Sequence, residues 1–229
     1  MQPKRGLFVT GTDTDVGKTY ITAMIARQLV AEGQRVAVYK PVASGCENVN
    51  GTLVSEDATT LWEATGRHGA LDSVCPQRFA APLSPHRAAQ QDGKQVDEEQ
   101  LRVGLTAAAS DCDVVLIEGA GGLLSPISAD EFNADLAFDF GYPMIVVAAN
   151  GLGVINQTLQ TLVTAETFRE GIGVAGVILN DRHDCSDLSC RTNAEDLRDR
   201  SVPPLLAEVA FASKSISPRV DWLTIAEGL

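Results

Sequence analysis

The stretch Thr10-Gly11-Thr12-Asp13-Thr14-Asp15-Val16-Gly17-Lys18-Thr19 ends in the Gly-Lys-Thr of a phosphate-binding loop. The apolar run 7–9 precedes it, and apolar residues at helical spacing follow it at Ile21, Met24, Ile25 and Leu29. A strand before the loop and a helix after it are the setting in which this motif binds phosphate. Five residues separate Gly11 from Gly17, one more than in the usual loop. The stretch predicts that the chain binds a nucleotide.

The residue types of this loop suit a phosphate ligand. Glycine lets the backbone curl so that its N–H groups point at phosphate oxygens, and the following helix adds the partial positive charge of its N-terminus. Lys18 would reach the β- and γ-phosphates, and the Thr19 hydroxyl would ligate Mg²⁺.

Outside the loop, apolar runs alternate with segments of helical periodicity along the whole chain. The predicted strands are 6–10, 35–39, 113–117, 144–149 and 174–179, with a short run near 205–209. The predicted helices are 18–32, 56–65, 97–110, 154–170 and 192–200. Strands this rich in Val, Ile and Leu are covered on both faces. The pattern predicts an α/β fold in one domain, 1–229: a P-loop NTPase-like, doubly wound, mostly parallel sheet with helices on both faces.

The longest stretch without a predicted element is 66–95, which carries three prolines. A stretch of that length inside a compact domain is usually functional or mobile.

Composition narrows the class of protein. The 229 residues carry 18 basic and 30 acidic side chains, a net charge of −12, which argues against a nucleic-acid partner. No apolar run reaches the length of a membrane span, and no signal-peptide pattern is recognisable at the start of the sequence, so neither is expected. The five cysteines lack CxxC spacing and are expected to be reduced thiols in a cytoplasmic protein; they are Cys46, Cys75, Cys112, Cys185 and Cys190.

Ligands of open α/β sheets bind at the carboxyl ends of the strands. Lys40 follows the second predicted strand; it could be solvated there, or it could help neutralise a phosphoryl group beside the loop. Ser44, a few residues on, could hydrogen-bond a substrate. Glu118 ends the third strand before the glycine-rich run 119–122, where P-loop enzymes keep an acid that helps to hold Mg²⁺.

Three further sites, one acid, one Asn-Asp pair and one histidine, each have an ordinary structural interpretation. Asp57 opens a predicted helix, where an acid ordinarily caps the N-terminus. Asn180 and Asp181 follow the fifth strand and could form a turn or read an adenine edge. His86, in a Ser-Pro-His loop, is read as a surface residue, because no nucleophile and base arrangement accompanies it.

Taken together, these segments resemble the dethiobiotin synthetase family. The matching pieces lie in family order over nearly the whole chain: 11–19, Lys40-Pro-Val-Ala-Ser-Gly45, Ser84-Pro-His86, Glu118-Gly-Ala-Gly-Gly122, Gly153-Val-Ile-Asn156, Asn180-Asp181 and Pro204-Leu-Leu206. The resemblance implies an ATP-dependent cyclo-ligase that closes a cyclic urea from 7,8-diaminononanoate and CO₂ in biotin biosynthesis. In that family the diamine becomes a carbamate, ATP phosphorylates the carbamate, and the second amine displaces phosphate. The resemblance also implies Mg²⁺ and a homodimer.

The family's site residues carry over position by position. Lys40 is the catalytic lysine, with Lys18 assisting. The metal ligands are Thr19, Asp57 and Glu118. The residues that bind ATP are Thr14, Asp15, Val16, Gly17, Lys18, Thr19, Asp57, Glu118, Gly119, Ala120, Gly121, Asn180, Asp181, Pro204, Leu205 and Leu206. The residues that bind the diamine are Thr14, Lys18, Lys40 and Ser44, with Gly153, Val154, Ile155 and Asn156 of the other subunit receiving its carboxylate tail.

The alternative is a ParA- or MinD-type ATPase that acts as a switch. That class carries a second, signature lysine early in its loop, at the position where this chain has Asp13. The sequence also departs from the synthetase pattern. Asp15 stands where family members commonly have Glu, Ala207-Glu-Val-Ala210 stands where they often have Gly-Glu-Ile-Pro, and 182–192 matches no family segment.

Overall fold

The computed structural model describes residues 5–184 and 187–228. Its central element is a six-stranded sheet in the order β10-β9-β8-β1-β7-β2, with every neighbouring pair parallel. The strands are β1 (Gly6–Gly11), β2 (Val36–Tyr39), β7 (Val114–Gly122), β8 (Met144–Ala149), β9 (Val174–Asn180) and β10 (Leu205–Val209). All six predicted strands are therefore confirmed, and so is the parallel α/β fold.

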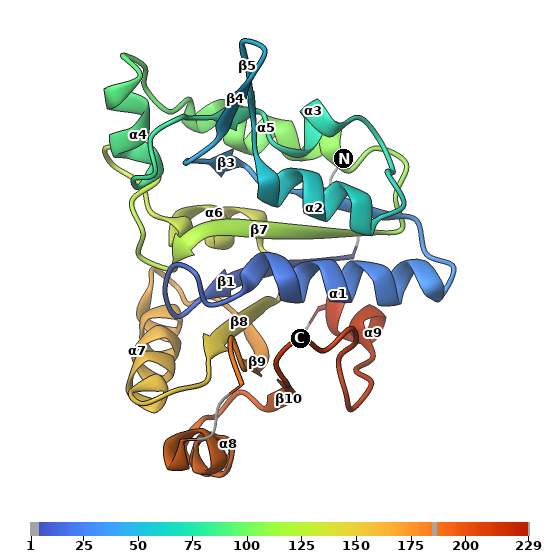
Figure 1. The fold of residues 1–229 in the computed structure, drawn as a ribbon, viewed down its shortest axis with the longest axis vertical. Coiled ribbons are helices and arrows are strands. Elements are labelled where there is room, and N and C mark those ends of the chain that lie inside the picture. The colour runs from blue at the N-terminus through green and yellow to red at the C-terminus, as the bar shows by residue number, and fades with distance from the viewer. Residues whose placement is uncertain (1–4, 185–186, 229) are drawn as a thin grey trace.

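Helices cover both faces of this sheet (Figure 1). One face packs against α1 (Lys18–Ala31), α2 (Glu56–Ala64) and α9 (Trp222–Ala226). The other packs against α5 (Glu98–Ala108), α6 (Asn133–Phe140), α7 (Val154–Thr167) and α8 (Leu188–Arg200). Alternate strand residues serve the two faces: Phe8 lies in one apolar cluster, and Leu7 and Val9 lie in the other. Each such buried side chain contributes about 1.5–3 kcal/mol to stability.

Several short elements complete the chain. They are β3 (Val42–Ala43), β4 (Glu47–Val49), β5 (Thr52–Val54), α3 (Leu71–Val74), β6 (Gln77–Arg78) and α4 (Pro85–Gln91). β4 and β5 form an antiparallel hairpin, and β3 pairs with β6. The stretch 66–95 was predicted to lack elements, but it contains α3, β6 and α4. Each is too short to produce a periodic pattern in the sequence.

Two other expectations can be compared with the structure. Cys46, Cys75 and Cys112 are free thiols, but Cys190 is disulfide-bonded, so the prediction of reduced thiols is wrong there. The argument from CxxC spacing missed that bond, because cysteines at other separations can also pair. Cys185 lies outside the described residues. Over the ranges that the structure describes, none of the helices combines the length and apolar composition needed to cross a membrane.

Candidate functional site

The phosphate-binding loop joins β1 to α1 beside the carboxyl end of β7 (Figure 1). Gly17 forms the N-cap of α1 with φ +95°, a conformation that favours glycine. A Cβ at Gly17 would lie 2.2 Å from Asn180 Nδ2, so no larger residue fits. Asn180 Nδ2 donates to Val16 O over 3.0 Å, and Lys18 Nζ donates to Asp13 O over 3.1 Å. These two bonds hold the loop in shape.

A cavity of about 370 Å³ opens on this loop. Half of the predicted site residues line it: Thr14, Asp15, Gly17, Lys18, Thr19, Lys40, Ser44, Asp57, Glu118, Ala120 and Gly121, together with Tyr20 and Ala43. Val16 instead packs into the core, 4% exposed. Segments from β2, α2 and β7 thus meet at the loop, as the rule for carboxyl strand ends predicts.

Lys40 lies at the centre of a buried charge cluster. Its Nζ lies 2.7 Å from Asp57 Oδ2 and also contacts Glu118 Oε1. Glu118 has no exposed side-chain surface, and its Oε1 accepts a 2.9 Å hydrogen bond from Thr19 Oγ1. Its Oε2 is buried with no hydrogen-bond partner among the described residues. A buried, unpartnered carboxylate oxygen is costly unless a ligand completes it.

The charges of this cluster shift the pKa values of its members. Burial opposes the ammonium form of Lys40, but the Glu118 and Asp57 carboxylates outweigh burial and raise its pKa. Burial likewise opposes the charged form of Asp57, and Lys40 nevertheless holds the pKa of Asp57 below its usual range. Lys18 behaves differently: burial, and then the charge of Lys40, lower its pKa to about 8. The cavity therefore holds one lysine whose pKa is raised and one whose pKa is lowered to about 8.

The donor set Thr19, Asp57 and Glu118 suits a hard divalent cation. All three offer oxygen ligands, which Mg²⁺ prefers, and Glu118 Oε2 is the unpartnered oxygen that such an ion would complete. Within the described ranges no group of three or more His, Cys, Asp or Glu side chains is arranged to hold a metal. The candidate set combines two carboxylates with the hydroxyl of Thr19, and Mg²⁺ is commonly bound by one or two carboxylates together with water and substrate phosphates.

The glycine-rich turn at the end of β7 is held by a residue that the sequence did not single out. Asn133 Oδ1 accepts from Ala120 N over 3.1 Å, and Asn133 Nδ2 donates to Gly122 O over 2.9 Å. Asn133 is 1% exposed. Gly119 lies against Asn133, where a Cβ would come within 3.2 Å of its Oδ1, rather than on the cavity wall. No motif marks Asn133, because its partners are backbone atoms.

A second cavity, of about 280 Å³, shares Asp15, Gly17 and Tyr20 with the first. Asn180 and Asp181 line it, as predicted, together with Arg182, Phe211 and Ala212. Arg182 Nη2 lies 3.0 Å from Asp15 Oδ2 across this cavity. A slot beside the phosphate loop that contains an aromatic ring suits a nucleotide base.

The structure contradicts one part of the predicted base site. Pro204, Leu205 and Leu206 lie at the start of β10, with Leu205 opposite Val177, whereas Asn180 at the end of β9 lies opposite Val209. Because the strands are parallel, 204–206 lie at the amino end of β10, beside the middle of β9, and they line neither the phosphate cavity nor the base cavity. Phe211 and Ala212, which follow β10, take the predicted place instead.

The turn 153–156 begins α7, with Gly153 as its N-cap at φ +96°. It follows β8 at the carboxyl edge of the sheet, but its residues line neither cavity of their own chain. Leu152, directly before it, is 95% exposed. His86 also lines neither cavity; its Nε2 lies 3.2 Å from Gln90 Nε2 within α4.

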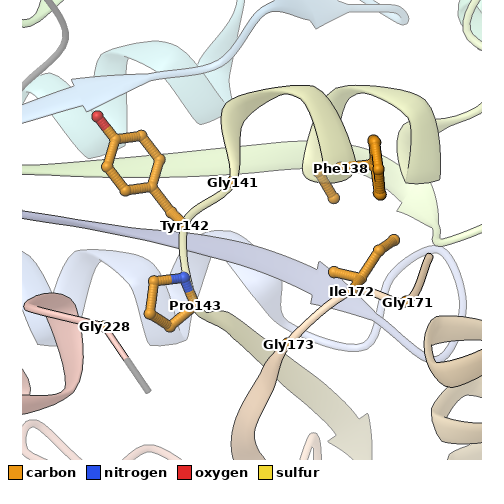
Figure 2. Close-up of a pocket in the computed structure, with 9 residues that line it drawn as sticks. Phe138, Gly141, Tyr142, Pro143, Gly171, Ile172, Gly173 and Gly228 are labelled. Atoms are coloured by element: carbon orange, nitrogen blue, oxygen red, sulfur yellow. The ribbon is translucent and has the colours of Figure 1, made fainter.

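A third cavity, of about 350 Å³, lies at the opposite edge of the sheet. Figure 2 shows Tyr142 and Pro143 on one side of it, with Phe138 and Ile172 on the other. Its residues precede β8 and β9, so it opens at the amino ends of the strands. The described residues that line it include no carboxylate, lysine or histidine, and they offer none of the groups used for phosphate or metal chemistry.

Comparisons with known proteins agree with this geometry. A family model described as an AAA domain matches residues 5–219. The ATP-dependent dethiobiotin synthetase BioD of Rhodopirellula baltica is 50% identical over 213 residues, covering 88% of this chain and 82% of that protein. The protein of the same name from Anoxybacillus flavithermus is 33% identical over 226 residues, which cover 95% of this chain and 99% of that protein.

Among solved structures, a ParA family ATPase from Chlorobium tepidum aligns with a TM-score of 0.57 at 17% identity, covering 93% of this chain and 85% of that one. A chain of the MinC:MinD cell division protein complex of Aquifex aeolicus aligns with a TM-score of 0.54 at 15% identity, covering 92% of this chain and 82% of that one. These likenesses establish the P-loop fold alone. The sequence relatives are far closer, and they show that this chain belongs to the family of ATP-dependent dethiobiotin synthetases.

Proposed function

We propose that this chain closes the cyclic urea of dethiobiotin from 7,8-diaminononanoate and CO₂, with conversion of ATP to ADP and phosphate. The observation that carries the proposal is one cavity in which the phosphate loop, two lysines and a carboxylate pair meet. The loop and Lys18 suit a triphosphate, and Lys40 and Ser44 extend the same wall toward a second substrate.

The reaction proceeds in three steps. One amine of the diamine adds to CO₂ and loses a proton, which forms a carbamate. A carbamate oxygen then attacks the γ-phosphorus of ATP, and ADP leaves. The second amine attacks the carbonyl carbon of the resulting carbamic-phosphoric anhydride, phosphate leaves with the bridging oxygen, and the ring closes.

The charges of the cavity favour the second step. A carbamate and a triphosphate repel each other, and the attack requires cations between them. Lys40, whose pKa is raised, provides a permanent ammonium group facing the carbamate, and Lys18 lies against the phosphates. Bound Mg²⁺, held by Thr19, Asp57 and Glu118, would add Lewis-acid stabilisation of the phosphoryl charge.

We further propose that the enzyme is a cytoplasmic homodimer and that residues 1–229 act as one domain. The turn Gly153–Asn156 of one subunit would receive the diamine's carboxylate in the site of the other, because a helix N-terminus suits an anion. The turn lies outside the cavity of its own chain, and the exposed Leu152 beside it supports this arrangement.

The proposal predicts that the purified protein forms dethiobiotin, ADP and phosphate in equal amounts from the diamine, bicarbonate and MgATP. Coupled ADP detection and mass spectrometry of the product measure this. ADP formation that is independent of the diamine, as in a switch ATPase, would contradict the proposal.

The lowered pKa of Lys18 predicts that ATP binding takes up a proton. The phosphates favour the ammonium form, so binding raises the pKa of Lys18 from about 8. Affinity is then full below pH 8 and falls as the pH rises through 8, and uptake approaches one proton per ATP at about pH 9. Calorimetry in buffers of different ionisation enthalpy measures the uptake. A Lys18→Arg variant, which is permanently charged, should bind ATP without proton uptake. Equal proton uptake in both proteins would show that Lys18 is not the group that takes up the proton.

A further inference from the structure

Two buried, hydrogen-bonded asparagines lie next to the carboxyl end of β8. Asn150 follows β8 and Asn193 lies on α8; they are 8% and 4% exposed. Asn193 Nδ2 donates to Asn150 Oδ1 over 2.8 Å, which joins the two amides into one network. Neither residue lines the phosphate or the base cavity.

Asn150, at one end of this network, bonds to residues that line the base cavity. Asn150 Nδ2 donates to Asp181 Oδ1 over 2.7 Å, and Asn150 N donates to Asn180 O over 2.8 Å. Asp181 and Asn180 line the slot for the nucleotide base, and Asn180 also holds the phosphate loop through Val16 O. A shift of Asn150 would therefore move two walls of the nucleotide site.

Asn193, at the other end of the network, bonds to the backbone just before the turn that begins α7. Asn193 Nδ2 donates to Gly151 O over 3.0 Å, and the same oxygen accepts from Val154 N over 3.2 Å. Val154 is the first residue of α7. Asn193 thereby fixes the start of the turn Gly153–Asn156, which the proposed function assigns to the carboxylate tail of the diamine.

The side-chain NH₂ groups of both asparagines use both of their hydrogens in these contacts. Asn150 Nδ2 has a second partner in Cys190 O at 3.1 Å, and the two bonds of Asn193 Nδ2 use both of its hydrogens. Loss of the Asn193 side chain would leave Asn150 Oδ1 and Gly151 O without these donors. Buried groups left without a partner draw the chain toward another arrangement.

We propose that Asn150 and Asn193 are positioning residues that set the nucleotide-base wall and the substrate-tail turn from one buried network. This inference rests on the proposed function for the identity of the tail. It assigns no contact with either substrate to the two asparagines. They act through Asp181, Asn180 and the Gly151 carbonyl.

The test compares Asn193→Ala with Leu197→Ala in the full-length protein. Leu197 is fully buried on the same helix and makes no bond to the network, so its truncation loosens α8 without removing the amides. For Asn193→Ala we expect the Kd of ATP and the KM of the diamine each to rise on the order of tenfold, with a smaller change in kcat. Leu197→Ala should lower the melting temperature at least as far while leaving Kd and KM near wild type.

A double-mutant cycle separates positioning from general loosening. If Asn193 acts on the base through Asn150 and Asp181, its effect on the ATP Kd shrinks in an Asp181→Ala background. Additive effects, or an Asn193→Ala protein with unchanged Kd and KM, would overturn the inference, and so would equal changes in Leu197→Ala. Calorimetric ATP binding needs no turnover. A wild-type protein that binds ATP but does not react with the diamine would therefore refute the proposed reaction, and the comparison of ATP Kd values among the variants would still test the inference.

Discussion

Lys40→Ala is expected to lower turnover by on the order of 10²–10³ while ATP binding stays close to wild type, because one preorganised cation at the reacting group is typically worth that factor. The Lys40 side chain is 5% exposed and is held by Asp57 and Glu118, so its ammonium group has a defined position. ATP is held instead by Lys18 and the loop amides. Loss in kcat with little change in ATP affinity is thus the expected signature.

Steady-state kinetics and ATP calorimetry on the same preparation measure the two quantities. Lys94→Ala, which removes an exposed lysine outside the phosphate and base cavities, serves as the matched control and should behave as wild type. Near-normal turnover of Lys40→Ala would remove Lys40 from the chemistry. A large loss of ATP affinity would instead place Lys40 in nucleotide binding.

Glu118→Gln is expected to abolish tight divalent-metal binding and to lower turnover by a similar factor. The substitution keeps the shape of the side chain but removes the charge that Thr19 and Lys40 contact. It also deprives a buried ammonium group of one partner, a change that costs roughly 3–5 kcal/mol where the pair is fully buried. Asp57 still neutralises Lys40, and its side chain is 47% exposed, so we expect a stability loss below that range.

Manganese binding followed by electron paramagnetic resonance, with and without ADP, measures the metal effect apart from turnover, and thermal melting measures the stability effect. Glu56→Gln, the control, alters the exposed carboxylate next to Asp57 in the sequence. It should change neither the manganese affinity nor the melting temperature. Unaltered manganese affinity in Glu118→Gln would show that the metal site lies elsewhere.

The sequence predicted those parts of the fold and site that depend on local pattern. The strand, loop and helix from Gly6 to Ala31 were recognisable because the apolar runs and the Gly-Lys-Thr motif are contiguous. Lys40 and Glu118 were paired by a general rule, since parallel strands bring their carboxyl ends to one edge. Their direct contact across 78 positions could not be read from spacing.

The parts that were missed depend on tertiary contacts. α9 has only five residues, too few for a periodic signal; Trp222 places it by packing into the core and donating to Gln28 Oε1 over 3.0 Å. The error at Pro204–Leu206 arose because the direction and register of β10 against β9 decide which end faces the loop. Asn133, Asn150 and Asn193 carry no motif, because most of their partners are backbone groups brought near by the fold and the others are side chains distant in the sequence.

The central claim is that a carbamate oxygen attacks ATP. Brief reaction of the diamine, MgATP and ¹⁸O-labelled bicarbonate, followed by mass spectrometry of the released phosphate, tests it most directly. The account predicts one labelled oxygen transferred into phosphate for each dethiobiotin formed, with a second retained in the urea carbonyl. Dethiobiotin formed with unlabelled phosphate would contradict it, because ATP would then have been cleaved by water or by another group.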